Sequence, residues 1–236
     1  MINKIIEKFK SRTVLKYLSW KLGITKIKAK VFKILNTELR RWFADKGDEK
    51  LRFDYDFKDD GLILELGAYT GEDLDKFINN YDCKIIAFEP SKSLFQELQE
   101  KYSSSKAEIL NFGLYDTNSE YFLIEKNDGS FIKEKVNEKS DKYEKVILKK
   151  LSDFIAERDL DFISLINMNI EGSEYKVLKD LIESGFIKKI NHLQIQFHRS
   201  SFFYFINRYF LIKKLIKTHN LKWRYKYVWE RWDLKQ

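Results

Sequence analysis

The stretch that decides the fold is Leu62-Ile63-Leu64-Glu65-Leu66-Gly67-Ala68-Tyr69-Thr70-Gly71. An apolar run of strand character carries one carboxylate and is followed by two glycines, the second where a helix could begin. Glycine permits a tight turn and a close approach to the backbone, and the start of a helix offers unpaired N–H groups. The stretch therefore predicts the first loop of a parallel sheet, where a nucleotide-like ligand binds, with a plain tight turn as the alternative.

Strand and helix patterns alternate after this loop. The expected strands are 62–66, 84–88, 107–110, 121–124, 146–148, 162–170, 190–197 and a closing strand at 223–229. The expected helices are 72–79, 93–102, 151–157, 173–184 and 202–219. Such alternation is typical of a doubly wound α/β fold with a mostly parallel sheet, whose ligands bind beyond the carboxyl ends of the strands. The polar stretch 125–144 is expected to be a mobile loop or a lid.

The two ends of the chain are basic. Residues 1–52 hold 15 Lys and Arg against 5 Asp and Glu, whereas residues 53–198 hold 19 against 29. Apolar residues at helical spacing predict two or three amphipathic helices over 1–46. We therefore expect a basic helical N-terminal extension over 1–60 and one domain over 61–236. Basic ends can meet nucleic acid, an anionic membrane or a nucleotide-linked sugar, or can fold against the acidic middle.

Several classes of protein are disfavoured by composition. The single cysteine, Cys83, cannot form an internal disulfide or a metal cluster and is expected to be buried and inert. No metal site is expected. Because no stretch reads as a membrane span or a signal peptide, we expect a cytoplasmic protein, with peripheral contact between its basic N-terminal helices and the inner face of a membrane as an option.

A second carboxylate, Glu89, ends the strand 84–88 and lies 22 residues after Gly67. A carboxylate at this place can accept both hydroxyls of a ribose, although a solvated strand-end residue is the alternative. Pro90, the only proline, stops the strand and fixes the turn that presents Glu89. Tyr69 stands where the dinucleotide fingerprint has its middle glycine, so the pattern favours S-adenosylmethionine over a nicotinamide dinucleotide.

Polar residues also follow the longest apolar strand. Alternation places Asn167, Asn169 and Glu171 on one side of it, and polar groups in a buried strand need partners or a ligand. These residues are therefore candidates for the site.

His198 follows the next strand at its carboxyl end. Histidine is the usual base near neutral pH, but a structural hydrogen-bonding role is an equal alternative. His192 and His219 are expected on the surface or in loops, and Glu230 is expected to pair with neighbouring arginines.

Four ordered segments resemble the FkbM-type S-adenosylmethionine-dependent methyltransferases. They are Leu64–Gly71, Ala87–Pro90, Asn111–Leu114 and Asn169–Glu174. The resemblance covers about residues 60–232 and implies a class I methyltransferase fold, which is Rossmann-like, with an antiparallel C-terminal strand. Residues 194–198 and 228–232 look like a branch associated with bacterial surface glycans, which implies O-methylation of a sugar hydroxyl.

The resemblance also implies roles for individual residues. The implied cofactor-binding residues are Glu65, Gly67, Ala68, Tyr69, Gly71, Glu89, Pro90, Gly113 and Leu114. The implied catalytic residues are His198, Glu171 and Asn169, with His198 as the first candidate for the base. Many members carry asparagine at the position of Tyr69, and lysine and aspartate at those of Asn167 and Asn169. The missing aspartate disfavours metal use and favours Glu171 and His198.

The expected function is methyl transfer to a sugar hydroxyl in the biosynthesis of capsule, O-antigen or lipooligosaccharide, with a glycan or nucleotide-sugar substrate. RNA methylation is an alternative, but one proline excludes an Asn-Pro-Pro-Tyr motif and the acidic middle disfavours nucleic acid. The same residues are also compatible with a non-catalytic scaffold for glycan assembly and, less well, with a nicotinamide dehydrogenase.

Overall fold

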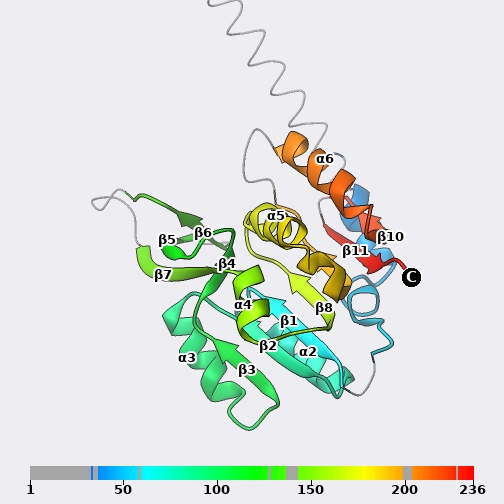
Figure 1. Ribbon diagram of the computed structural model, residues 1–236. Helices are drawn as coiled ribbons and strands as arrows, with labels where there is room; N and C mark the ends of the chain where they lie inside the picture. The colour runs from blue at the N-terminus through cyan, green and yellow to red at the C-terminus, as the bar shows by residue number, and fades with distance from the viewer. Residues whose placement is uncertain are drawn as a thin grey trace, which may run out of the picture.

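The computed structural model describes residues 33, 37–57, 60–126, 129–136, 143–198, 204–226 and 228–236. A seven-stranded sheet has the order β10-β11-β9-β8-β1-β2-β3 (Figure 1). Its strands are β1 (Leu62–Leu66), β2 (Lys84–Phe88), β3 (Ala107–Leu110), β8 (Ile163–Met168), β9 (Ile190–Ile195), β10 (His219–Tyr225) and β11 (Trp229–Leu234).

Five of these strands, from β3 to β9 across the sheet, are parallel, and β11 is antiparallel to both of its neighbours. The doubly wound, mostly parallel sheet with an antiparallel C-terminal strand is therefore confirmed. The order of the strands reverses direction at β1, because β2 lies on one side of it and β8 on the other. Ligands of open α/β sheets bind at such a point.

Helices cover both faces of the sheet. They are α2 (Glu72–Asn80), α3 (Lys92–Lys101), α4 (Leu151–Glu157), α5 (Glu174–Ser184) and α6 (Tyr204–Leu215), with short 3-10 helices η1 (Leu51–Phe53) and η2 (Phe186–Lys189). Leu64 and Leu66 of β1 join the core formed with α4, α5 and α6, whereas Ile63 joins the core formed with α2 and α3. The alternation of side chains along β1 thus builds two layers of core.

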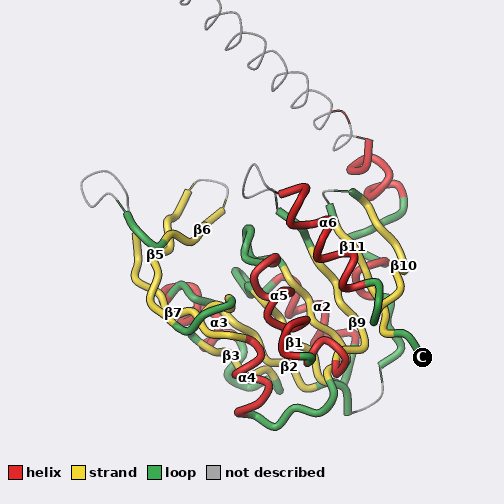
Figure 2. Tube along the Cα trace, turned by 45° about the horizontal axis from the view of Figure 1, so that its top comes forward, coloured by secondary structure: helices red, strands yellow, loops and turns green. Residues whose placement is uncertain are grey.

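A second, four-stranded sheet has the order β4-β7-β5-β6 and lies to one side of the first (Figure 2). Its strands are β4 (Gly113–Tyr115), β5 (Ser119–Lys126), β6 (Gly129–Lys133) and β7 (Tyr143–Lys150). The expectation of a loop over 125–144 was wrong for β6, which pairs antiparallel with β5. This strand was missed because it is only five residues long and has charged flanks. Residues 127–128 and 137–142 lie outside the described part.

Most of the expected N-terminal helices, and with them the expected membrane contact, lie outside the described residues. Residues 37–44 are helical, and Trp42 packs there against Trp223 and Tyr225 with ring centroids 5.7 and 5.0 Å apart. No helix in the described part of the chain is both long enough and apolar enough to cross a membrane.

Two expectations near the C-terminus were wrong. The helix that was expected to reach His219 ends at Leu215, and the strand expected at 223–229 is a hairpin of β10 and β11. The turn between these strands contains no glycine or proline, so its residues carry no turn signal. His219 is fully buried, with Nε2 3.0 Å from the carbonyl oxygen of Ile190, and His192 lies in β9 with Nδ1 2.7 Å from Asp233.

Candidate functional site

The loop after β1 approaches the end of β8 closely. Gly67 has a φ of 86°, and a Cβ added to it would lie 2.4 Å from the carbonyl oxygen of Asn169. Tyr69 has a φ of 49° and its side chain is 64% exposed. This left-handed conformation is one that asparagine adopts more readily than tyrosine. The asparagine of many resembling sequences therefore suits this backbone better than Tyr69 does.

Glu89 ties this loop to the end of β2. Its carboxylate oxygens accept hydrogen bonds from the backbone N–H groups of Tyr69 and Ser91, each at 2.9 Å. Burial raises the pKa of Glu89 to about 7, although the two N–H groups act in the opposite direction. Each oxygen keeps a further lone pair. The group can therefore accept hydroxyls of a ribose, provided that it is ionised.

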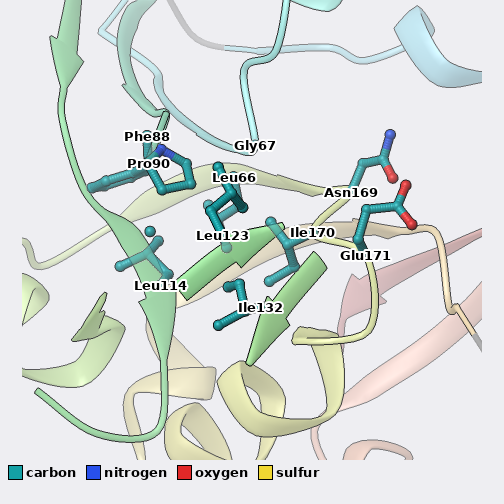
Figure 3. Close-up of a pocket in the computed structure, with 11 residues that line it drawn as sticks. Leu66, Gly67, Phe88, Pro90, Leu114, Leu123, Ile132, Asn169, Ile170 and Glu171 are labelled. Carbon is teal, nitrogen blue, oxygen red and sulfur yellow. The ribbon is translucent and has the colours of Figure 1, made fainter. Parts of the chain in front are cut away.

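A cavity lies at the carboxyl ends of β1, β2 and β8 (Figure 3). Its lining residues are Leu66, Gly67, Phe88, Pro90, Gly113, Leu114, Leu123, Ile132, Asn169, Ile170 and Glu171. Six predicted site residues are among them: Gly67, Pro90, Gly113, Leu114, Asn169 and Glu171. Leu123 and Ile132 come from β5 and β6 and were not predicted as site residues. Ile132 lies in the expected loop, whereas Leu123 lies in an expected strand that no local pattern placed beside the cavity. The cavity thus combines an apolar wall with a polar end.

The predicted residue Glu65 lies in the interior and does not line this cavity. Both of its carboxylate oxygens accept hydrogen bonds from Nδ2 of Asn167, at 2.9 and 2.8 Å. Nε2 of Gln194 donates to Oδ1 of Asn167 at 2.7 Å. Burial, and then the charge of Asp73, raise the pKa of Glu65 well above its ordinary value. Glu65 therefore links β1 to β8 in the interior of the protein.

The expectation that Asn167 shares one face with Asn169 and Glu171 was wrong. Strand β8 ends at Met168, and Glu171 has a left-handed φ of 49°, so alternation does not extend to the last two residues. Asn169 and Glu171 both line the cavity, and in Figure 3 their polar ends lie on the same side of it. Oδ1 of Asn169 is buried and has no hydrogen-bond partner among the described residues, so its capacity to accept a hydrogen bond is unused there.

Glu171 is in contact with His198. Nε2 of His198 lies 3.4 Å from Oε1 of Glu171, and Nδ1 lies 2.7 Å from Oε1 of Glu174. Burial lowers the pKa of His198, but the hydrogen bond to Glu174 and the charges of Glu174 and Glu171 outweigh it and raise the pKa. Burial also raises the pKa of Glu171. Glu171 lines the cavity and His198 does not, so Glu171 is the better placed of the two for contact with a substrate.

The remaining predicted residues flank the same loop. Ala68 is buried, and Gly71 has a φ of 82° at the start of α2. A Cβ on Gly71 would lie 2.4 Å from the hydroxyl of Tyr102. Within the described residues, no group of three or more His, Cys, Asp or Glu side chains could hold a metal ion.

Residues 65–227 match the model of the methyltransferase FkbM domain. The chain belongs to the FkbM methyltransferase family. A comparison with curated proteins gives no significant match. The family assignment and the topology together establish a Rossmann-like, S-adenosylmethionine-dependent methyltransferase.

Solved structures show a general likeness at low identity. An rRNA methylase from Streptococcus thermophilus is 8% identical, with 76% of this chain and 89% of that chain covered and a TM-score of 0.44. The N-terminal domain of human METTL16 in complex with SAH is 12% identical, with 77% and 65% covered and a TM-score of 0.42. The fibrillarin pre-rRNA processing protein of Methanococcus jannaschii is 10% identical, with 75% and 67% covered and a TM-score of 0.43.

The residues present fit S-adenosylmethionine. Gly67 lines the cavity and has no side chain to keep a ligand from the backbone, and the buried carboxylate of Glu89, between the lining residues Phe88 and Pro90, suits a ribose. The apolar wall that includes Leu114 and Ile132 suits an adenine ring. When bound, the cofactor supplies an electrophilic methyl group on a sulfonium.

Proposed function

We propose that the protein is an O-methyltransferase that acts on a sugar hydroxyl in the biosynthesis of a bacterial surface glycan. The observation that carries the proposal is the polar end of the cavity, where Asn169 and Glu171 offer hydrogen-bond acceptors beside the cofactor loop. Hydroxyl groups are donors and match such acceptors. The resemblance of residues 194–198 and 228–232 to the glycan-associated branch supports a sugar as the molecule that carries the hydroxyl.

The charge of the cavity also supports a reacting hydroxyl that has no phosphate directly beside it. Among the described residues that line it, Glu171 is the only charged one, and none is a lysine or an arginine. A wall without cations is poorly suited to a phosphate beside the reacting hydroxyl. This observation favours a sugar hydroxyl over the ribose of an RNA chain.

We assign the removal of the hydroxyl proton to Glu171. The acceptor oxygen forms a bond to the methyl carbon as the bond from that carbon to sulfur breaks, and the hydroxyl proton passes to the carboxylate of Glu171. Its side chain is 46% exposed, so the proton can then leave to solvent. The protein supplies alignment and a proton acceptor, because the methyl group is already activated.

A transfer assay with methyl-labelled S-adenosylmethionine tests the proposal. The acceptors are nucleotide sugars, surface glycans prepared without methyl groups, and RNA. We expect label on a sugar hydroxyl. Label on RNA alone would replace the proposal with RNA methylation, and binding of the cofactor without transfer to any acceptor would favour a scaffold.

Replacement of Glu171 tests its role. We expect Glu171→Gln to lower kcat by about 10²- to 10⁴-fold, because the amide cannot accept the proton, while the affinity for the cofactor changes little. Glu157→Gln, at an exposed carboxylate of α4, is the matched control. Equal losses in kcat and in cofactor affinity would assign Glu171 to cofactor binding instead.

A further inference from the structure

Glu174 is a fully buried carboxylate in the first turn of α5. Its Oε1 accepts hydrogen bonds from the backbone N–H groups of Ile170 and Gly172, at 3.3 and 3.1 Å, and lies 2.7 Å from Nδ1 of His198. Its Oε2 is buried and has no hydrogen-bond partner among the described residues. A buried carboxylate is costly unless donors hold it, so these three contacts are what keeps the group in place.

Two of the donors flank the proposed proton acceptor. Ile170 and Gly172 lie on either side of Glu171, whose φ of 49° is uncommon for a residue other than glycine. A turn of this kind persists only when its surroundings hold it. By accepting both N–H groups, Glu174 fixes the direction in which Glu171 leaves the backbone.

The third donor brings His198 to the same place. Because Nδ1 of His198 faces Glu174, the other ring nitrogen faces Glu171, at 3.4 Å. Arg208 of α6 lies over the ring of the neighbouring residue Phe197 and pairs with Glu230. Among the described residues, the charged groups that act on the imidazole are Glu174 and Glu171.

We propose that Glu174 is a positioning residue for methyl transfer, which holds the Glu171 turn and the His198 ring in one array. The inference rests on the proposed role of Glu171 as proton acceptor. In this array the two carboxylates favour the cationic form of His198, and the charge of that form in turn favours the ionised form of Glu171, against the effect of burial. The hydroxyl proton is transferred to Glu171, while His198 and Glu174 keep their protonation states. Glu174 was not predicted as a site residue; its place three residues after Glu171 was the available signal.

Titration of His198 by NMR in the full-length protein tests this array without any acceptor. The chain has three histidines, so His198→Gln identifies the resonance. We expect the imidazole of the wild type to titrate above pH 6.5, and Glu174→Gln to lower its midpoint by about one pH unit or more, because the neighbouring charge is lost while the shape is kept. Glu183→Gln, on the same helix but half exposed, should leave the midpoint unchanged.

Kinetics supply the second readout. We expect Glu174→Gln to lower kcat by about 10- to 100-fold, the range for groups that orient a reacting residue, with the cofactor Kd within about twofold. The double variant with His198→Gln should cost little more than either change alone.

The outcomes separate this inference from the proposed function. A wild-type midpoint at or below 6.5, or one that Glu174→Gln leaves unchanged, would overturn the array, as would additive losses in the double variant. If Glu174→Gln does not fold, the wild-type titration still decides. Absence of transfer to any sugar refutes the proposed function and leaves the NMR result to be judged alone.

Discussion

At the scale of single residues, the predicted ribose acceptor Glu89 makes both stability and cofactor affinity depend on pH. Its carboxyl is 5% exposed, and burial raises its pKa to about 7, above the ordinary value of 4.5. When the pKa of a group is higher in the folded state than in the unfolded state, the contribution of that group to stability falls as the pH rises from the lower pKa to the higher one. The apo protein therefore loses stability from this group between pH 4.5 and about 7, by about 3 kcal/mol in total.

Cofactor affinity should depend on pH in the opposite direction. A ribose diol donates to the ionised form of Glu89, so we expect the Kd for S-adenosylhomocysteine to rise by up to about tenfold per unit as the pH falls below 7. Calorimetric titrations between pH 5.5 and 8.5 measure this. Glu89→Gln should bind weakly with little pH dependence, whereas Glu97→Gln, at an exposed carboxylate of α3, should behave as the wild type. A flat profile in the wild type would show that Glu89 does not hold the ribose as an anion.

The polar side chains around Asn167 show how a neutral amide is accommodated at a position where many resembling sequences carry lysine. Nδ2 of Asn167 lies within 3.0 Å of both oxygens of Glu65 and of Oδ2 of Asp73, yet an amide has two hydrogens for these three acceptors. Arg52 pairs with Asp73 and supplies the balancing charge. Because the amide of Asn167 is neutral, the negative charges of Glu65 and Asp73 must be balanced in another way. Either Arg52 balances them, or Glu65, whose pKa is raised, carries a proton.

At the scale of elements, the hairpin of β5 and β6 forms one wall of the cavity at the carboxyl ends of β1, β2 and β8. Ile132 of β6 lines the cavity, whereas Ile147 of β7, in the same sheet, is 53% exposed and does not. We expect Ile132→Ala to raise the Kd for S-adenosylhomocysteine by roughly tenfold, because about 1–2 kcal/mol of apolar contact is lost. Ile147→Ala is the matched control. Equal affinities in both variants would show that the hairpin does not contact the cofactor.

The elements differ in how far the sequence predicts them. Strands β1, β2 and β3 were predicted to the residue, because each is an apolar run bounded by glycine, proline or charged residues. Six predicted residues line the cavity: Gly67, Pro90, Asn169 and Glu171, which follow strands, and Gly113 and Leu114, which the family resemblance implied. Local sequence patterns did not predict features that depend on contacts between distant residues. Ile132 joins the cavity through the pairing of β6 with β5, and His219 is buried by the packing of an edge strand.

At the scale of the whole molecule, the segment before β1 packs onto the C-terminal hairpin. Trp42 is 1% exposed, lies against Trp223 and Tyr225, and donates from Nε1 to Asp48 at 2.8 Å. A Cβ on Gly47 would overlap its ring, with 2.0 Å to the nearest ring atom. The two ends of the described chain are therefore joined through one aromatic cluster.

We expect Trp42→Ala to lower the free energy of unfolding by about 3–5 kcal/mol, because it removes a large buried side chain and leaves a cavity. Its neighbour Phe43 is 69% exposed, so Phe43→Ala should change the stability by less than about 0.5 kcal/mol. Denaturant unfolding followed by tryptophan fluorescence and by circular dichroism measures both variants. If Trp42→Ala lowers the unfolding midpoint measured by fluorescence but not the midpoint measured by circular dichroism, residues 37–57 unfold separately from the sheet. If the two transitions coincide, both ends of the chain belong to one cooperative unit.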